Sequence, residues 1–178
     1  MARVAERVNA MNAALKIQPP DSPMSDLQRR SLVKFLNDTL ATTLMSVMRS
    51  RRHHFLCASL GGATGLAASA ELLRHAHKEM GHADLVVARI LQLGGRPDFD
   101  TGGRIERGHP DCKVSGSLAG MLKEDLWAQR LAVDAHGRTA RFIGDNDPTT
   151  RRLFDWLGAQ GEAQAGALES FLNRLADD

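Results

Sequence analysis

Residues 79–99 read EMGHADLVVARILQLGGRPDF and form the most informative segment of the chain. The apolar residues of this segment continue a stripe at three- and four-residue steps, which is typical of one face of an amphipathic helix. Gly94-Gly95 stands where a helix is expected to stop, and Pro97 follows it. We therefore predict a long helix from about Leu66 to Leu93.

Three further helical patterns flank this segment. The first begins with a capping-box signature, Ser25 followed three residues later by Gln28. The last begins with Asp147 as cap and Pro148 at the first helical position. The predicted ranges are Ser25 to about Cys57, Ser117 or Leu118 to Ile143, and Asp147 to about Leu175.

The composition agrees with an all-α protein. Tyr is absent and aromatic residues make up 4% of the 178 residues, so residues that favour strands are scarce. The net charge of +2 is far below that expected of a protein that neutralises many phosphates. The sequence has two cysteines, which lie outside any CxxC spacing, and it has neither an apolar run long enough to span a bilayer nor a secretory signal. We therefore expect a cytoplasmic protein without membrane contact.

The connection at residues 96–116 contains four Gly and two Pro and is too long for a tight helix hairpin. It is long enough to cross the length of a bundle. We therefore predict a four-helix bundle, residues 25–178, in which two antiparallel helix pairs are joined by this crossover. We expect residues 1–24 to form a separate N-terminal arm that is mobile or docked on the surface.

A candidate metal-binding pair lies on the second predicted helix. Glu79 and His82 are three residues apart and face the same side of a helix, with His75 on the neighbouring turn. A carboxylate with an imidazole suits iron, manganese or zinc. Glu-x-x-His is common in helices by chance, so a solvated or hydrogen-bonded Glu and His is the alternative.

Four segments carry a family resemblance: residues 36–44, 79–99, 121–126 and 144–152. Together they resemble the four helices and turns of bacterioferritins and related Dps-like ferritins, in register from about residue 32 to the end. The resemblance implies a ferritin-like bundle, iron storage or iron homeostasis, and oxidation of Fe(II) by O2 at a di-iron centre. It also implies an oligomer, at least a dimer and up to a hollow cage.

The family's six metal ligands are only partly kept. The resemblance places two of them on Glu79 and His82. The other four positions carry Thr43, Gln129, Gly161 and Gln164, none of which is the family's residue type. Neutral side chains cannot bridge two cations or offset their charge, so we predict a degenerate ferroxidase centre with iron bound weakly at a remnant site and little or no enzyme activity.

Neighbouring residues offer few replacements for these ligands. Glu162 follows Gly161, but a shift of one residue turns a helical side chain by about 100°. His75 is a better candidate than His136. Met80 falls on the family position that ligates haem b between two subunits, although a Met on an apolar helix face is more often a packing residue.

Two functions of different class remain. The first is an iron-storage subunit that assembles with itself, or with a catalytically competent ferritin subunit. The second is a non-catalytic structural or interaction bundle that has lost iron handling and contacts DNA or a partner through Arg3, Arg7 and Lys16 of the arm. An O2-dependent di-iron enzyme with a remodelled site is a third reading, and the basic residues 51–54 are interpreted as solvated surface near a helix end.

Overall fold

The computed structural model describes residues 13, 24–101 and 116–177. Four long helices and a short 3-10 turn make up its regular structure, and the described residues contain no strand. The helices are α2 (Asp26–Leu60), α3 (Gly62–Gln92), α5 (Leu118–Ile143) and α6 (Pro148–Asp177), with the 3-10 turn at Gly144–Asn146. The predicted all-α class and helix number are confirmed.

The predicted helix starts match the structure at α2, α5 and α6. The side chain of Ser25 accepts a hydrogen bond from the Gln28 amide at 3.3 Å, and Gln28 Oε1 accepts one from the Ser25 amide at 3.0 Å, which completes the capping box. In contrast, α3 begins at Gly62, four residues before the predicted Leu66. The reason is that the first turn carries small residues without an apolar stripe, so periodicity could not show it.

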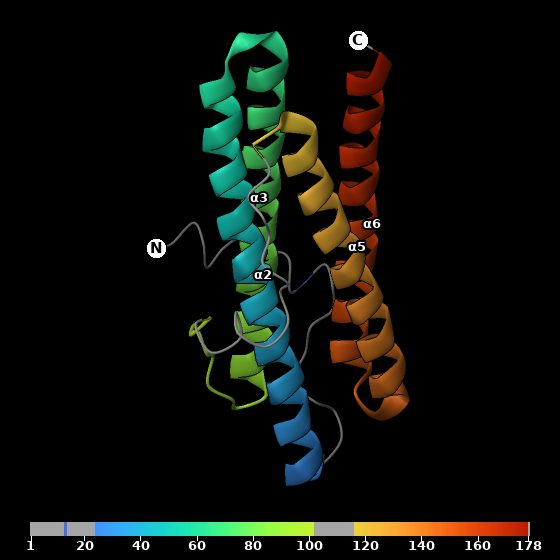
Figure 1. Ribbon diagram of the computed structural model, residues 1–178. Coiled ribbons are helices and arrows are strands. Elements are labelled where there is room, and N and C mark those ends of the chain that lie inside the picture. Colours follow the sequence, from blue (N-terminus) through green and yellow to red (C-terminus); the bar gives the residue numbers. More distant parts are fainter. Residues whose placement is uncertain (1–12, 14–23, 102–115, 178) are drawn as a thin grey trace.

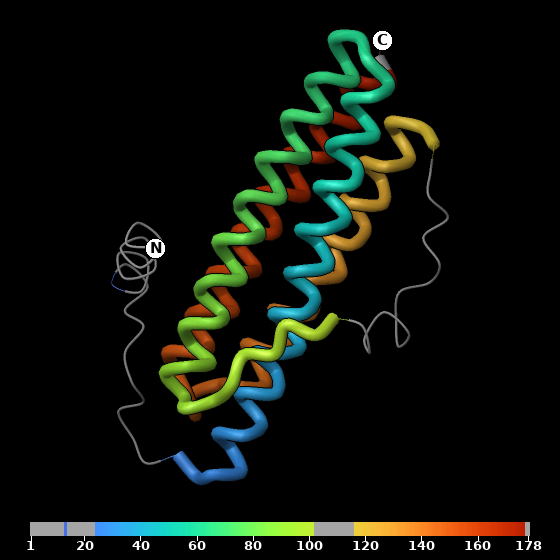
Figure 2. Tube along the Cα trace, turned by 90° about the vertical axis from the view of Figure 1, so that its left-hand side faces the viewer, coloured from blue at the N-terminus to red at the C-terminus, as the bar shows by residue number. Residues whose placement is uncertain are grey.

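The four helices form two antiparallel pairs, α2 with α3 and α5 with α6 (Figure 1). Figure 2 shows that α3 ends at one end of the bundle and α5 begins towards the other, so the connection crosses the bundle as predicted. Asn37 fixes the start of this connection, because its side chain donates to the Arg96 carbonyl at 3.1 Å and accepts from the Asp98 amide at 2.8 Å. The middle of the connection and nearly all of the predicted arm lie outside the described residues.

The core consists of two apolar clusters separated along the bundle axis. One cluster gathers buried side chains from the first half of α2, the second half of α3 and the facing ends of α5 and α6, among them Leu36, Ile90 and Phe154. The other lies near the opposite end and includes Leu72 and Leu122. Every helix passes from one cluster to the other through a layer of buried polar residues.

A buried ion pair anchors the turn between α5 and α6. Arg89 is fully buried and its Nη2 lies 2.7 Å from Asp147 Oδ2, while its Nε donates to the Thr150 hydroxyl at 2.8 Å. Asp147 also accepts from the Thr150 amide at 3.1 Å and so caps α6 as predicted. Burial alone would raise the pKa of Asp147, but hydrogen bonds from Thr150 and Arg89 outweigh it and lower the pKa.

No helix in the described ranges is both long and apolar enough to cross a membrane.

Candidate metal centre

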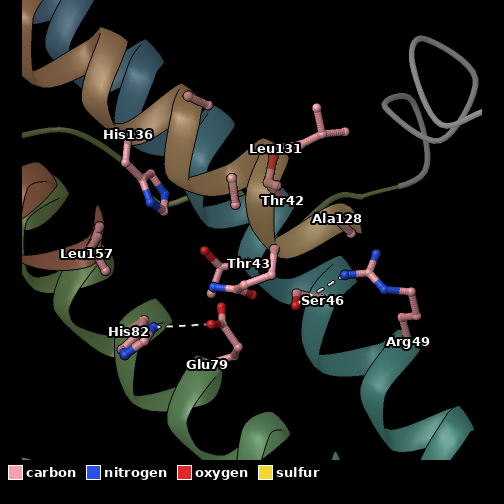
Figure 3. Close-up of a pocket in the computed structure, with 13 residues that line it drawn as sticks. Thr42, Thr43, Ser46, Arg49, Glu79, His82, Ala128, Leu131, His136 and Leu157 are labelled. Carbon is pink, nitrogen blue, oxygen red and sulfur yellow. Dashed lines mark hydrogen bonds and ion pairs between the residues drawn. The ribbon is translucent and has the colours of Figure 1, made fainter. Parts of the chain in front are cut away.

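The polar layer between the two apolar clusters brings together all six positions that the resemblance assigned to metal ligands. Each of the six is buried, although they come from four different helices. A cavity of about 200 Å³ opens into this layer between α2 and α5 (Figure 3). Its walls include four of the six positions, namely Thr43, Glu79, His82 and Gln129.

Glu79 is the central charged group of the layer. Its Oε1 lies 3.4 Å from His82 Nδ1 and 3.7 Å from His75 Nε2. Burial alone would raise the pKa of Glu79, but the polar contacts with His75 and His82 outweigh it and lower the pKa to about 2. Glu79 is therefore a carboxylate at neutral pH, ready to bind a cation.

His75 is committed to another partner. Its Nε2 lies 3.2 Å from Gln129 Oε1, and because an amide oxygen only accepts, Nε2 must carry the proton. The remaining ring nitrogen, Nδ1, is buried without a hydrogen-bond partner. The structure thus places His75 in the layer, as the sequence suggested, but with Nε2 unavailable as a ligand in this arrangement.

His136 reaches the cavity from the opposite wall. Figure 3 shows it on α5, facing Glu79 and His82 on α3 across the cavity. Burial lowers the pKa of His136 to about 4, so the imidazole is neutral at physiological pH and one of its nitrogens keeps a lone pair. Sequence reasoning ranked this residue below His75, because the helical phase of α5 relative to α3 is not visible in sequence. Glu162, in contrast, is exposed, as the helix geometry predicts.

The substituted positions offer little to a metal ion. The hydroxyl of Thr43 donates to the Thr39 carbonyl of its own helix at 2.9 Å. A Cβ atom placed on Gly161 would lie 2.6 Å from Val133 Cγ2 and 3.0 Å from Gln129 Nε2. The side chain of Val133 therefore stands where a carboxylate from position 161 would begin.

The donor set differs from what a pair of iron ions requires. Two divalent cations need several carboxylates to bridge them and to offset their charge, and the cavity wall supplies one, Glu79. As the side chains stand, no three His, Cys, Asp or Glu residues in the described part of the chain are arranged to share an ion. The residues present therefore do not fit a di-iron group.

A second buried network lies next to the cavity and was not foreseen from the sequence. The Asp125 carboxylate accepts from His53 Nδ1 at 2.6 Å, from Ser50 at 3.0 Å and from Arg49 Nε at 3.0 Å. Burial would raise the pKa of Asp125, but the hydrogen bond from His53 and the charges of Arg49 and His53 lower it. His53 is fully buried. The interpretation of residues 51–54 as solvated surface is therefore wrong for His53, which turns inward because its helical phase points at α5.

Met80 lies outside this layer. Its side chain is 43% exposed on the outward face of α3. It cannot reach the cavity, because it follows Glu79 by one residue and a helix turns about 100° per residue. Met80 is therefore a surface residue of the isolated chain.

Comparison with known proteins places the chain among ferritin-type structures. Residues 33–177 match the family described as Ferritin-like domain. The bacterioferritin-related dodecameric thioferritin from Bacteroides fragilis is 23% identical, with a TM-score of 0.75 and coverage of 93% of this chain and 95% of the thioferritin.

Two further structures show the same fold. Bacterioferritin from Rhodobacter capsulatus, described with a metal-free dinuclear site and heme iron, is 21% identical, with a TM-score of 0.71 and coverage of 83% and 87% of the two chains. A Dps1 variant from Mycobacterium smegmatis is 17% identical, with a TM-score of 0.76 and coverage of 84% and 99%. The comparison with curated proteins gives no match.

Proposed function

Because the chain belongs to the Ferritin-like domain family, we propose that it is an iron-storage or iron-homeostasis subunit of a ferritin-type oligomer with a degenerate ferroxidase centre. The observation that carries the proposal is that Glu79 is the single carboxylate in the wall of the cavity, at the place where the family builds its iron site. The subunit then contributes to a shell and holds iron, while fast oxidation of paired Fe(II) is absent.

Charge and space both support the degenerate centre. Two Fe(II) ions carry four positive charges, and Glu79 offsets one of them. Gln129 and Gln164 are neutral, and the Thr43 hydroxyl donates its hydrogen bond to a carbonyl of its own helix. Gly161 cannot be replaced by a larger residue without movement of Val133.

Self-association is supported by an apolar stripe on the outward face of α3. Its residues recur at seven- and four-residue steps, so they share one face of the helix. They are exposed or half-buried and comprise Leu66, Leu73, Met80, Val87 and Leu91. A stripe of this length on a helix surface is typical of a protein interface, and we propose that two copies of the chain meet there, as a dimer or as part of a cage.

This arrangement bears on the remaining cofactor and partner hypotheses. Met80 lies on the stripe, so two copies would bring two thioethers to one interface, where the resemblance puts haem b. A catalytically competent ferritin subunit in the same shell would supply the oxidation that this chain lacks.

We also propose that the protein acts in the cytoplasm, where a free thiol such as that of Cys57 persists.

The test is anaerobic titration with Fe(II) followed by exposure to O2. Absorbance reports oxidation, native mass reports assembly, and iron per subunit is measured after gel filtration. We expect a large assembly that retains iron but shows no rapid phase at about two irons per subunit. The double variant Glu79→Ala/His82→Ala should oxidise iron at nearly the same rate as the wild type, because there is little activity to lose.

Other outcomes decide against parts of the proposal. A rapid two-iron phase that the double variant abolishes would refute the degenerate centre. A dimer that retains no iron would favour the structural or interaction bundle instead. Haem absorbance in the same preparation tests the haem hypothesis.

A further inference from the structure

The first turns of α2 extend past the end of the bundle. Figure 1 and Figure 2 show the start of α2 beyond the end of α3 and beyond the turn between α5 and α6. Two large apolar side chains are exposed at this end, Leu27 on α2 at 76% and Phe142 near the end of α5 at 68%. Large apolar side chains that gather on a surface mark a site of protein contact.

An apolar groove lies between the two helices at the same end. Its volume is about 330 Å³, and both Leu27 and Phe142 line it. Met24 and Leu32 add to the α2 side of the groove, and Ile143 adds to the α5 side. A cavity of about 150 Å³ holds a benzene ring, so the groove has room for about two apolar side chains.

The chain that precedes this groove carries an apolar face of its own. Residues 1–23 lead directly to Met24, which is itself part of the groove wall. Apolar residues of this segment follow one another at steps of four, three and four residues and are Val4, Val8, Met11 and Leu15. Their spacing predicts an amphipathic helix. Ala13 is helical and exposed, and its position two residues from Met11 and from Leu15 puts it on the opposite side of that helix.

We propose that residues 4–15 of the N-terminal arm dock as a helix in the groove of their own chain, with Met11 and Leu15 between α2 and the end of α5. Two apolar side chains match the volume of the groove. The contact covers Leu27 and Phe142 together with the apolar face of the arm, and removal of this apolar surface from water stabilises it. The proposal goes beyond the iron chemistry proposed above and does not depend on it.

Docking on the same chain is within reach of the connection. Met24 follows Leu15 by nine residues, and a chain of that length spans up to about 30 Å. Pro20-Asp21-Ser22 are typical turn residues, so the connection can reverse its direction. A segment tethered this closely has an effective concentration on the order of 1 mM, which favours it over the arm of a separate copy.

Hydrogen–deuterium exchange of the full-length protein tests the docking, with mass spectrometry of the arm peptides. We expect the amides of residues 8–15 to exchange at least about tenfold more slowly than in a synthetic peptide of residues 1–23. Leu15→Ser and Phe142→Ser should each remove most of this protection, because each takes one partner out of the contact.

Matched controls exist on both sides of the contact. Asn9→Ser changes a residue on the opposite side of the predicted helix from Met11. Met48→Ser changes a side chain of α2 that has the same exposed fraction as Phe142, 68%, and that does not line the groove. Both variants should leave the exchange of the arm unchanged.

A mixing experiment identifies the chain on which the arm docks. The Leu15→Ser and Phe142→Ser chains are co-expressed, so that an intact arm and an intact groove are present only on different chains. We expect the intact arm to stay unprotected in the mixed assemblies. Restored protection would show that the arm docks on another copy and would overturn docking on the same chain. Fast exchange of the arm in the wild-type protein, or protection that persists in Phe142→Ser, would overturn the groove as its site.

Discussion

Substitution of Gly161 by Ala tests the close packing of α6 on α5 that excludes the family's ligand. In an exposed helix interior, Gly→Ala stabilises by about 1 kcal/mol, because Ala loses less conformational entropy on folding. At Gly161 the new Cβ would lie 2.6 Å from Val133 Cγ2, where carbon atoms normally approach to about 3.5–4.0 Å. Relief of that overlap needs a movement of roughly 1 Å, and overpacking of this kind costs about 1–3 kcal/mol.

Gly166 provides a matched control on the same helix. Its added Cβ would meet nothing within 4 Å, so Gly166→Ala should raise the free energy of unfolding by about 1 kcal/mol. We expect Gly161→Ala to lie about 1–3 kcal/mol below that control, and to recover most of the difference in a Val133→Ala background. Urea unfolding at one protein concentration, followed by circular dichroism, measures all four variants. If Gly161→Ala stabilises the protein as much as Gly166→Ala, the packing argument is wrong.

Three further predictions follow from the buried polar groups. The pKa of His136 falls from 6.5 to about 4 on folding, so between these pH values the unfolded chain binds a proton that the folded protein does not. The free energy of unfolding should therefore decrease by up to about 3 kcal/mol as the pH falls from 6.5 to 4. Urea titrations should show a smaller dependence on pH for His136→Gln. Asp147→Ala removes the carboxylate that forms an ion pair with the buried Arg89 and should cost about 3–5 kcal/mol in urea unfolding, whereas Asp145→Ala, at an exposed ion pair, should cost less than about 1 kcal/mol. Restoring the family's residue types at all four substituted ligand positions should give rapid iron oxidation only when Val133→Ala is added, as stopped-flow absorbance would show.

The helices, their order and the buried layer that holds the candidate site could be predicted from sequence patterns and the family resemblance. Signals such as the Ser25 capping box and the Asp147 cap act between residues three or four apart, so they are visible without tertiary structure. The resemblance likewise assigned six ligand positions on four helices, and all six lie in one buried layer of the structure.

Which side chains meet in that layer could not be predicted, because it depends on how the four helices pack against one another. The commitment of His75 to Gln129, the approach of His136 to Glu79, the burial of His53 and the contact of Val133 with Gly161 all join different helices. Such contacts depend on the rotation and depth of one helix against another. Those are set by the summed packing of both apolar clusters, and no local sequence signal encodes them.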